Sequence, residues 1–125
     1  MAAARAQALP NDADQPLSAI IARDVERALA EDRGSGDLTA QLIDADLPGR
    51  ARVICREDAV LAGMPWFDAC FRALDAAVEI DWQVPEGGRL APDAVVCVVQ
   101  GQARALLTAE RPALNFLQTL SAVAT

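Results

Sequence analysis

The sequence predicts an α+β domain in which helices cover one face of a largely antiparallel sheet. Three observations lead to this prediction. Apolar residues recur at helical spacing over 17–29 and again over 64–74. They alternate with charged residues over 51–56 and 78–84, which is the period of a half-buried strand. A continuous apolar run at 94–99 indicates a further strand.

The chain begins with residues 1–15, which have no hydrophobic period and predict a loose lead-in to the first helix. The apolar residues of that helix start at Leu17, with charged residues on the opposite side. We expect the helix to end at Gly34, which can take the left-handed C-cap conformation, and Asp37 to cap a short turn. A phosphate-cradling loop at Gly34 and Gly36 is the alternative, weakened because the flanking carboxylates would repel a phosphate.

The first strand follows a turn at 47–49 and carries a row of three arginines, Arg50, Arg52 and Arg56. We interpret this row as a solvated face or as a rim that attracts anions. A strip that binds nucleic acid needs more positive charge and exposed aromatic residues.

The second helix carries Trp66, Phe67 and Phe71 at helical spacing, which indicates core packing rather than a cofactor pocket. The next strand ends in a turn at 85–88. We expect Gly101 to stop the last strand.

The stretch 104–118, RALLTAERPALNFLQ, brings the charge pair Glu110 and Arg111 against a long apolar helix. Proline is accepted in the first turn of a helix and disfavours a helical backbone in the residue before it. We therefore expect Arg111 at the N-terminus of this helix, with Thr108 or Arg111 as the cap. The helix dipole costs a cation there about 0.3–1 kcal/mol, which points to an anion brought from outside. The alternative is a surface Arg paired with Glu110 or Asp75.

Composition narrows the function classes. The net charge of -7 argues against nucleic acid or an anionic membrane as a partner, since either needs a basic face. No apolar run approaches the ~18 residues that cross a bilayer. Cys55, Cys70 and Cys97 lie far apart among apolar neighbours, so we expect buried thiols in a reducing, cytoplasmic compartment. The chain has neither His nor Lys, which excludes histidine bases, Schiff-base lysines and P-loop lysines from it.

Two motifs in the sequence resemble those of a known family. The stretch 104–118, followed by LSAVAT at 120–125, resembles a signature of quinolinate phosphoribosyltransferases. The residues 31–39 also match that family's Glu-Asp-x-Gly-x-Gly-Asp-x-Thr pattern. The resemblance implies that Arg111 reaches into the neighbouring subunit's active site and binds the carboxylates of the substrate. A guanidinium suits this role, because its planar fork donates two parallel hydrogen bonds to a carboxylate and keeps its charge.

The same resemblance implies an activity. The family transfers a phosphoribosyl group from phosphoribosyl pyrophosphate to quinolinate, releases carbon dioxide and makes nicotinate mononucleotide for NAD synthesis. It implies a homodimer or higher homo-oligomer, and Mg²⁺ that accompanies phosphoribosyl pyrophosphate. Its metal ligands and catalytic residues lie on an α/β barrel, so we expect none in this chain. We accordingly expect an N-terminal domain at 1–108, the first helix of an incomplete barrel at 109–125, and no activity from this chain alone.

Two other function classes remain open. The segment 84–96 resembles a biotinyl or lipoyl carrier hairpin, but such carriers need a Lys at the tip and this chain has none. The chain can also be a non-catalytic dimerisation domain.

Overall fold

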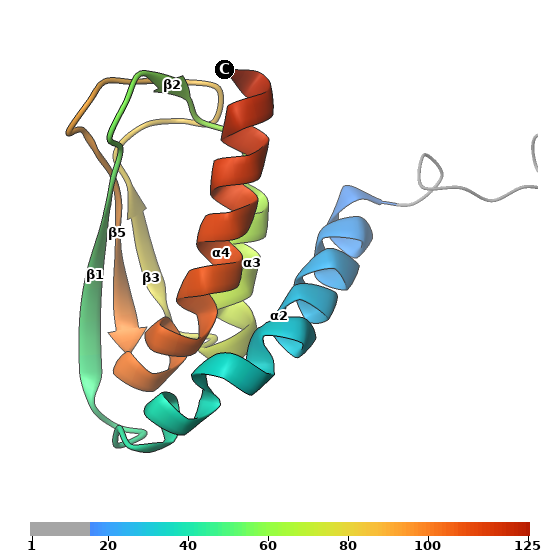
Figure 1. Ribbon diagram of the computed structural model, residues 1–125, viewed down its shortest axis with the longest axis vertical. Helices are drawn as coiled ribbons and strands as arrows, with labels where there is room; N and C mark the ends of the chain where they lie inside the picture. The colour runs from blue at the N-terminus through green and yellow to red at the C-terminus, as the bar shows by residue number, and fades with distance from the viewer. Residues whose placement is uncertain (1–15) are drawn as a thin grey trace, which may run out of the picture.

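The computed structural model describes residues 16–125, without the side chains of residues 33–40. The elements, in chain order, are α2 (Leu17–Gln41), β1 (Pro48–Ile54), β2 (Ala59–Val60), α3 (Met64–Leu74), β3 (Glu79–Trp82), β4 (Arg89–Leu90), β5 (Val95–Gln102) and α4 (Ala103–Ala124). Figure 1 shows a sheet, then a layer formed by α3 and α4, and then α2 on the far side of those helices. The predicted α+β architecture is confirmed.

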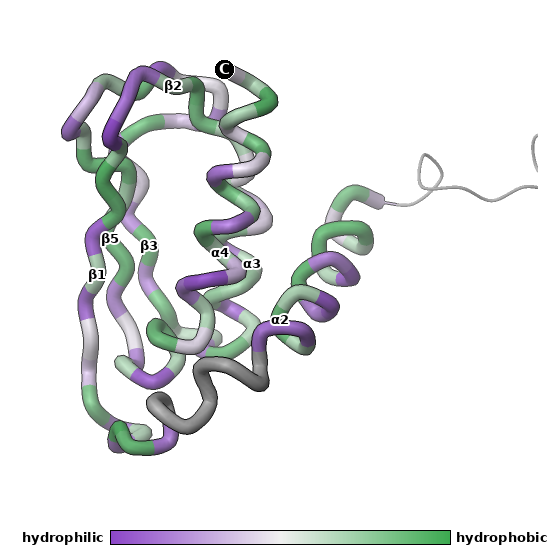
Figure 2. The backbone as a smooth tube through the Cα atoms, in the orientation of Figure 1, coloured by the Kyte–Doolittle hydropathy of each residue, from purple (hydrophilic) through white to green (hydrophobic). Residues whose placement is uncertain are grey.

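The main sheet has the strand order β1-β5-β3, and both pairs are antiparallel. The apolar run at 94–99 therefore belongs to the central strand. Val99 of this strand is fully buried and pairs with Ala51 on one side and with Ile80 on the other. The short strands β2 and β4 form a separate antiparallel pair. Figure 2 shows the contrast between the mostly apolar β5 and the alternating hydropathy of its neighbours.

The core lies between the sheet and the helices α3 and α4. Phe67 is fully buried, and its ring centroid lies 5.0 Å from that of Phe71 and 5.0 Å from that of Trp82. The prediction that these helix aromatics pack in the core is confirmed for Phe67 and Phe71. Trp66 is half-buried instead, and its Nε1 donates a hydrogen bond to Asp24 Oδ2 at 3.1 Å, which links α3 to α2.

The predicted end of the first helix at Gly34 is wrong, because α2 runs to Gln41. Gly34 and Gly36 both fall within it, so neither a C-cap nor a phosphate-cradling loop forms there. A glycine costs a helix interior only about 1 kcal/mol relative to alanine. The helix is held by its apolar face, on which Val25 and Leu29 are buried, and extending a formed helix is easier than starting one.

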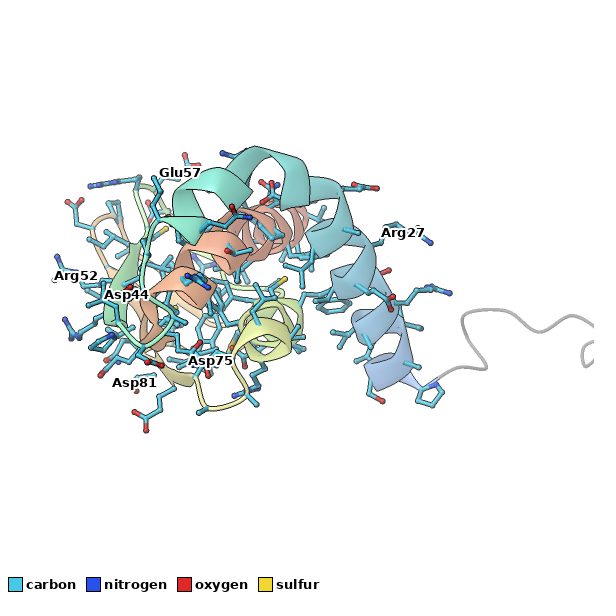
Figure 3. All side chains as sticks on the ribbon, turned by 90° about the horizontal axis from the view of Figure 1, so that it is seen from below. Arg27, Asp44, Arg52, Glu57, Asp75 and Asp81 are labelled. Carbon is cyan, nitrogen blue, oxygen red and sulfur yellow. The ribbon has the colours of Figure 1, made fainter. Side chains whose placement is uncertain are left out.

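Gly101 does not stop β5, which continues to Gln102. A Cβ at Gly101 would lie 2.6 Å from Oδ2 of Asp75, so the glycine makes room for that carboxylate. Asp75 is buried, and its Oδ2 accepts a hydrogen bond from the Gln102 N–H at 2.9 Å while Oδ1 accepts one from the Ala77 N–H at 3.0 Å. This carboxylate therefore satisfies backbone donors between α3 and β5 (Figure 3).

The predicted start of the last helix at Arg111 is also wrong, because α4 begins at Ala103 and contains Pro112 in its interior. An interior proline costs roughly 3 kcal/mol. The turns before it are nevertheless anchored, since Leu106 is buried, Ala109 is fully buried and Arg104 donates from Nε to the carbonyl of Ile43 at 3.0 Å. Burial of these turns offsets the local preference of proline.

The C-terminal half of α4 is joined to the segment between β2 and α3. Ser121 Oγ accepts from the Ala62 N–H at 3.0 Å and donates to the Ala62 carbonyl at 3.1 Å. Thr125 Oγ1 accepts from the Val60 N–H at 3.0 Å. The predicted division between 108 and 109 falls within this continuous helix and stays a prediction. Within residues 16–125, no helix has the length and apolar character needed to cross a membrane.

Candidate functional site

The sequence-predicted site residue, Arg111, lies on α4 where that helix packs beside α2. Its side chain is 65% exposed, and its Nη1 lies 3.7 Å from Oδ1 of Asp32, which is 20% exposed. The alternative prediction for Arg111, a surface ion pair, is thus met in part. The partner in this ion pair is Asp32 and not the predicted Glu110 or Asp75. The contact joins the two stretches that carry the family resemblance, 31–39 and 104–118.

The argument from the helix dipole does not hold for Arg111. The residue sits about two turns into α4, not at its N-terminus. The dipole effect is confined to the first and last turns of a helix. The case for Arg111 as a binding residue therefore rests on its exposure, its neighbourhood and the family.

A groove of about 530 Å³ lies between α2, α3 and α4 next to Arg111. Asp32, which pairs with Arg111, and Pro112, which follows it, both line this groove. The remaining lining residues are Asp24, Ala28, Glu31, Trp66, Asn115, Phe116, Thr119 and Leu120. The groove thus has an apolar and aromatic floor and an acidic side formed by α2.

The charges around the groove oppose a free dicarboxylate. Asp24, Glu31 and Asp32 line it, and Arg111 is adjacent. A diacid that approaches Arg111 must displace Asp32 or share the guanidinium with it, which its five N–H donors allow. None of the residues that line the groove is positively charged, so the groove by itself is no diacid site.

The N-terminus of α3 has a cap that sequence reasoning missed. Glu86, in the turn after β3, accepts hydrogen bonds from the Gly63 N–H at 3.0 Å and from the Met64 N–H at 3.2 Å. The same turn donates from the Gly87 N–H to the Leu61 carbonyl at 2.7 Å. The only sequence signal was an acidic residue in a Pro-Glu-Gly-Gly turn. Because the turn bonds to the domain itself, the carrier-hairpin alternative gains no support.

Three titratable groups inside the domain have shifted pKa values. Burial raises the pKa of the Cys70 and Cys97 thiols to about 12, and the nearby carboxylates Asp68 and Asp81 add to the shift of Cys97. Both thiols are therefore neutral and unreactive at neutral pH. Burial also raises the pKa of Asp68, against the hydrogen bond from Trp82 Nε1 at 2.9 Å and the nearby Arg72 guanidinium, which lower it.

Among the residues that the structure describes, no group of three or more His, Cys, Asp or Glu side chains is placed to hold a metal ion.

The structure is an α+β domain with helices on one face of its main sheet, and Arg111 lies exposed on α4 beside the groove. A family model described as quinolinate phosphoribosyl transferase, N-terminal domain, matches residues 37–121. The chain belongs to the quinolinate phosphoribosyltransferase family.

Individual relatives agree with this assignment. The chain is 37% identical over 101 residues to a probable carboxylating nicotinate-nucleotide pyrophosphorylase of Synechocystis, a match that covers 81% of this chain and 34% of the relative. The corresponding human protein is 41% identical over 85 residues, covering 68% of this chain and 28% of the relative.

A solved structure is similar as well. The nicotinate-nucleotide pyrophosphorylase of Francisella tularensis superposes with a TM-score of 0.76 at 33% identity, covering 88% of this chain and 40% of that one. The chain spans about a third of the length of the curated relatives it matches.

Proposed function

We propose that this chain acts as the N-terminal part of a quinolinate phosphoribosyltransferase. The enzyme joins the phosphoribosyl group of phosphoribosyl pyrophosphate to quinolinate and releases pyrophosphate and carbon dioxide, giving nicotinate mononucleotide for NAD synthesis. Family membership and the names of the relatives support this activity. The single observation in this chain that carries the proposal is the exposed Arg111 guanidinium beside the groove of α2 and α4.

Arg111 binds a carboxylate of quinolinate through two parallel hydrogen bonds. It does so in the active site of a neighbouring subunit, so the functional unit is a homodimer or a higher homo-oligomer. Two observations support a shared site. The Arg111 side chain is open to solvent, and the acidic groove behind it lacks the positive charge that a diacid requires. The neighbouring subunit supplies that charge.

The remaining chemistry belongs to residues beyond this chain. Expelling pyrophosphate requires cationic groups that offset the negative charge on the leaving group, and this chain has arginines but neither Lys nor His. Mg²⁺ accompanies phosphoribosyl pyrophosphate on the barrel part of the enzyme. We place the enzyme in the cytoplasm, because neutral buried thiols such as Cys70 and Cys97 suit a reducing compartment.

The test is the binding of quinolinate to the full-length enzyme that carries this chain. Replacing Arg111 by Ala removes a charge-assisted contact worth about 1.5–3 kcal/mol, so we expect the affinity to fall by roughly 10- to 150-fold. The affinity is measured by titration calorimetry. Near-UV circular dichroism should stay unchanged, because Arg111 is largely exposed.

A matched control is Arg56→Ala. Arg56 is also an exposed arginine in a surface ion pair, 3.8 Å from Asp93, but it lies two residues after the end of β1, and neither residue lines the groove. We expect this variant to bind quinolinate as the wild type does. Equal affinity in Arg111→Ala and wild type would reject the role of Arg111, and equal loss in both variants would show a general charge effect instead.

A further inference from the structure

Arg104, in the first turn of α4, holds a backbone carbonyl just beyond the C-terminal end of α2. Its Nε donates to the carbonyl of Ile43 at 3.0 Å, and its Nη2 donates to the same carbonyl. Both residues are half-buried, and α2 ends at Gln41, shortly before Ile43. A guanidinium that places two donors on one oxygen makes a strong charge-assisted contact. This contact therefore fixes the end of α2 to α4.

The ion pair of Arg111 and Asp32 is a second contact between the same two helices. Arg104 and Arg111 lie close to two helical turns apart on α4, so their side chains leave the helix on the same side. The two contacts follow each other in the opposite order along α2, where Asp32 precedes the end that Arg104 holds. Figure 1 shows this end of α2 beside the first turns of α4. Two arginines of one helix thus hold α2 at two points.

The part of α2 between these two points has a low helix propensity. Gly34 and Gly36 lie within it, and glycine disfavours a helix more than any residue except proline. A cation near the C-terminus of a helix stabilises it, but the last four residues of α2, LTAQ at 38–41, include no basic residue. Arg104 supplies this cation from α4. Because Asp32 lies just before the first of the two glycines, its position depends on how firmly the end of α2 is held.

We propose that Arg104 is a positioning residue for the Arg111 site, because it holds the end of α2 and thereby keeps Asp32 at the Arg111 guanidinium. This inference rests on the proposed function, in which Arg111 binds quinolinate. When Arg104 releases the carbonyl of Ile43, the glycine-containing end of α2 loosens and Asp32 moves away from Arg111. More of the guanidinium is then available to the substrate. Arg104 acts through Asp32 and not on the substrate itself.

A purely structural role of Arg104 is the alternative, since its partner is a half-buried backbone carbonyl. The two roles differ in how Arg104 is coupled to Asp32. A structural contact changes the affinity for quinolinate by the same factor whether or not residue 32 carries a carboxylate. A positioning contact changes the affinity only while that carboxylate is present. Combining substitutions at the two positions therefore distinguishes the roles.

The test uses Arg104→Met in the full-length enzyme, a change that removes both hydrogen bonds and keeps an unbranched stem. We expect the affinity for quinolinate to rise as in Asp32→Asn, by up to about 1.4- to 5-fold, and the double variant to bind no more tightly than Asp32→Asn alone. Arg104→Lys keeps the cation and one donor, so it should lie closer to the wild type. Titration calorimetry measures the affinities, and near-UV circular dichroism checks the fold. Wild-type or weaker affinity in Arg104→Met overturns the proposal, as does a change that persists in the Asp32→Asn background.

Backbone hydrogen exchange separates this proposal from the proposed function, because it needs no quinolinate. Read by mass spectrometry over residues 34–43, exchange should be faster by about tenfold or more in Arg104→Met. Arg56→Met is the matched control, since it removes an exposed arginine that does not contact α2 through its ion pair with Asp93, and its exchange should equal that of the wild type. Unchanged exchange in Arg104→Met overturns the positioning role whatever Arg111 binds. Wild-type quinolinate affinity in Arg111→Ala overturns the proposed function instead.

Discussion

The two sides of the helix α4 differ in burial and charge, and therefore in which substitutions they tolerate. The side toward the sheet and α3 carries small and apolar residues, with Ala109 and Ala113 fully buried and Leu117 at 5% exposure. The side toward α2 carries the exposed Arg111 and borders an acidic groove. The buried side tolerates few changes because its neighbours are close-packed. The groove side is set by charge, and its residues can change with little effect on the fold.

We expect the largest difference between the two sides in the stability of two leucine variants of this helix. Leu117→Ala removes a buried side chain and leaves a cavity, so we expect a loss of about 2–5 kcal/mol in the free energy of unfolding. Leu107 is 40% exposed, and Leu107→Ala should cost well under half as much. Urea denaturation followed by circular dichroism measures both. Similar losses in the two variants would contradict the division of α4 into a buried and an open side.

A smaller loss of stability is expected for a substitution near the C-terminal end of α4. Ser121→Ala removes a hydroxyl that both accepts from and donates to the backbone of Ala62. Leaving a part-buried N–H and carbonyl without this partner costs about 1–3 kcal/mol. Thr119→Ala, on the groove side of the same helix, is the control and should change stability by less than about 0.5 kcal/mol. The free energies come from urea denaturation, and equal values for the two variants would mean that the Ser121 contacts add nothing.

Substitutions on the groove side are expected to change ligand affinity more than the free energy of unfolding. Asp32→Asn removes the carboxylate that pairs with Arg111. Because the Arg111 side of this ion pair is largely exposed, the pair contributes about 0.2–1 kcal/mol and the loss of stability is small. In the proposed role of Arg111, Asp32 competes with quinolinate for the guanidinium, so the affinity of the full-length enzyme for quinolinate should rise by about 1.4- to 5-fold.

The control for this change is Glu26→Gln, which removes an exposed carboxylate from the same helix without touching the groove lining. Its affinity for quinolinate should equal that of the wild type. A weaker affinity in Asp32→Asn than in wild type would show that Asp32 orients Arg111 instead of competing for it.

The sequence predicted the parts of the fold that follow from hydrophobic period. The helix over 64–74 and the strands over 78–84 and 94–99 were found close to their predicted places, because burial of one face repeats along each of them. The two helix ends were wrong, since a glycine and a proline are local signals and tertiary burial outweighed them. The strand order was not accessible, because it depends on pairing between distant segments.

The candidate site was predicted only in part. The residue Arg111 was identified by the family resemblance, and its role stays a prediction. Its partner Asp32 was not found, since nothing in the spacing of 32 and 111 indicates that α2 and α4 meet there. The capping role of Glu86 was missed for the same reason, because the turn after β3 reaches back to α3 from a distant place in the chain.

Asp68 is a charged residue on the buried side of the domain. It lies on α3 and accepts a hydrogen bond from Trp82 of β3. Burial raises its pKa above the ordinary value of 3.8 although Trp82 and Arg72 act in the opposite direction. A carboxyl with a raised folded-state pKa binds more protons when folded than when unfolded, so stability falls as the pH rises from about 3.8 through the folded pKa.

Asp68→Asn keeps an oxygen that can accept the Trp82 hydrogen bond and removes the titration. The stability of this variant should therefore decline less than that of the wild type between pH 3.5 and neutral pH, as measured by urea denaturation across that range. A steeper decline in Asp68→Asn would mean that the charge of Asp68 stabilises the fold, through Arg72 and Trp82, more than its burial opposes it.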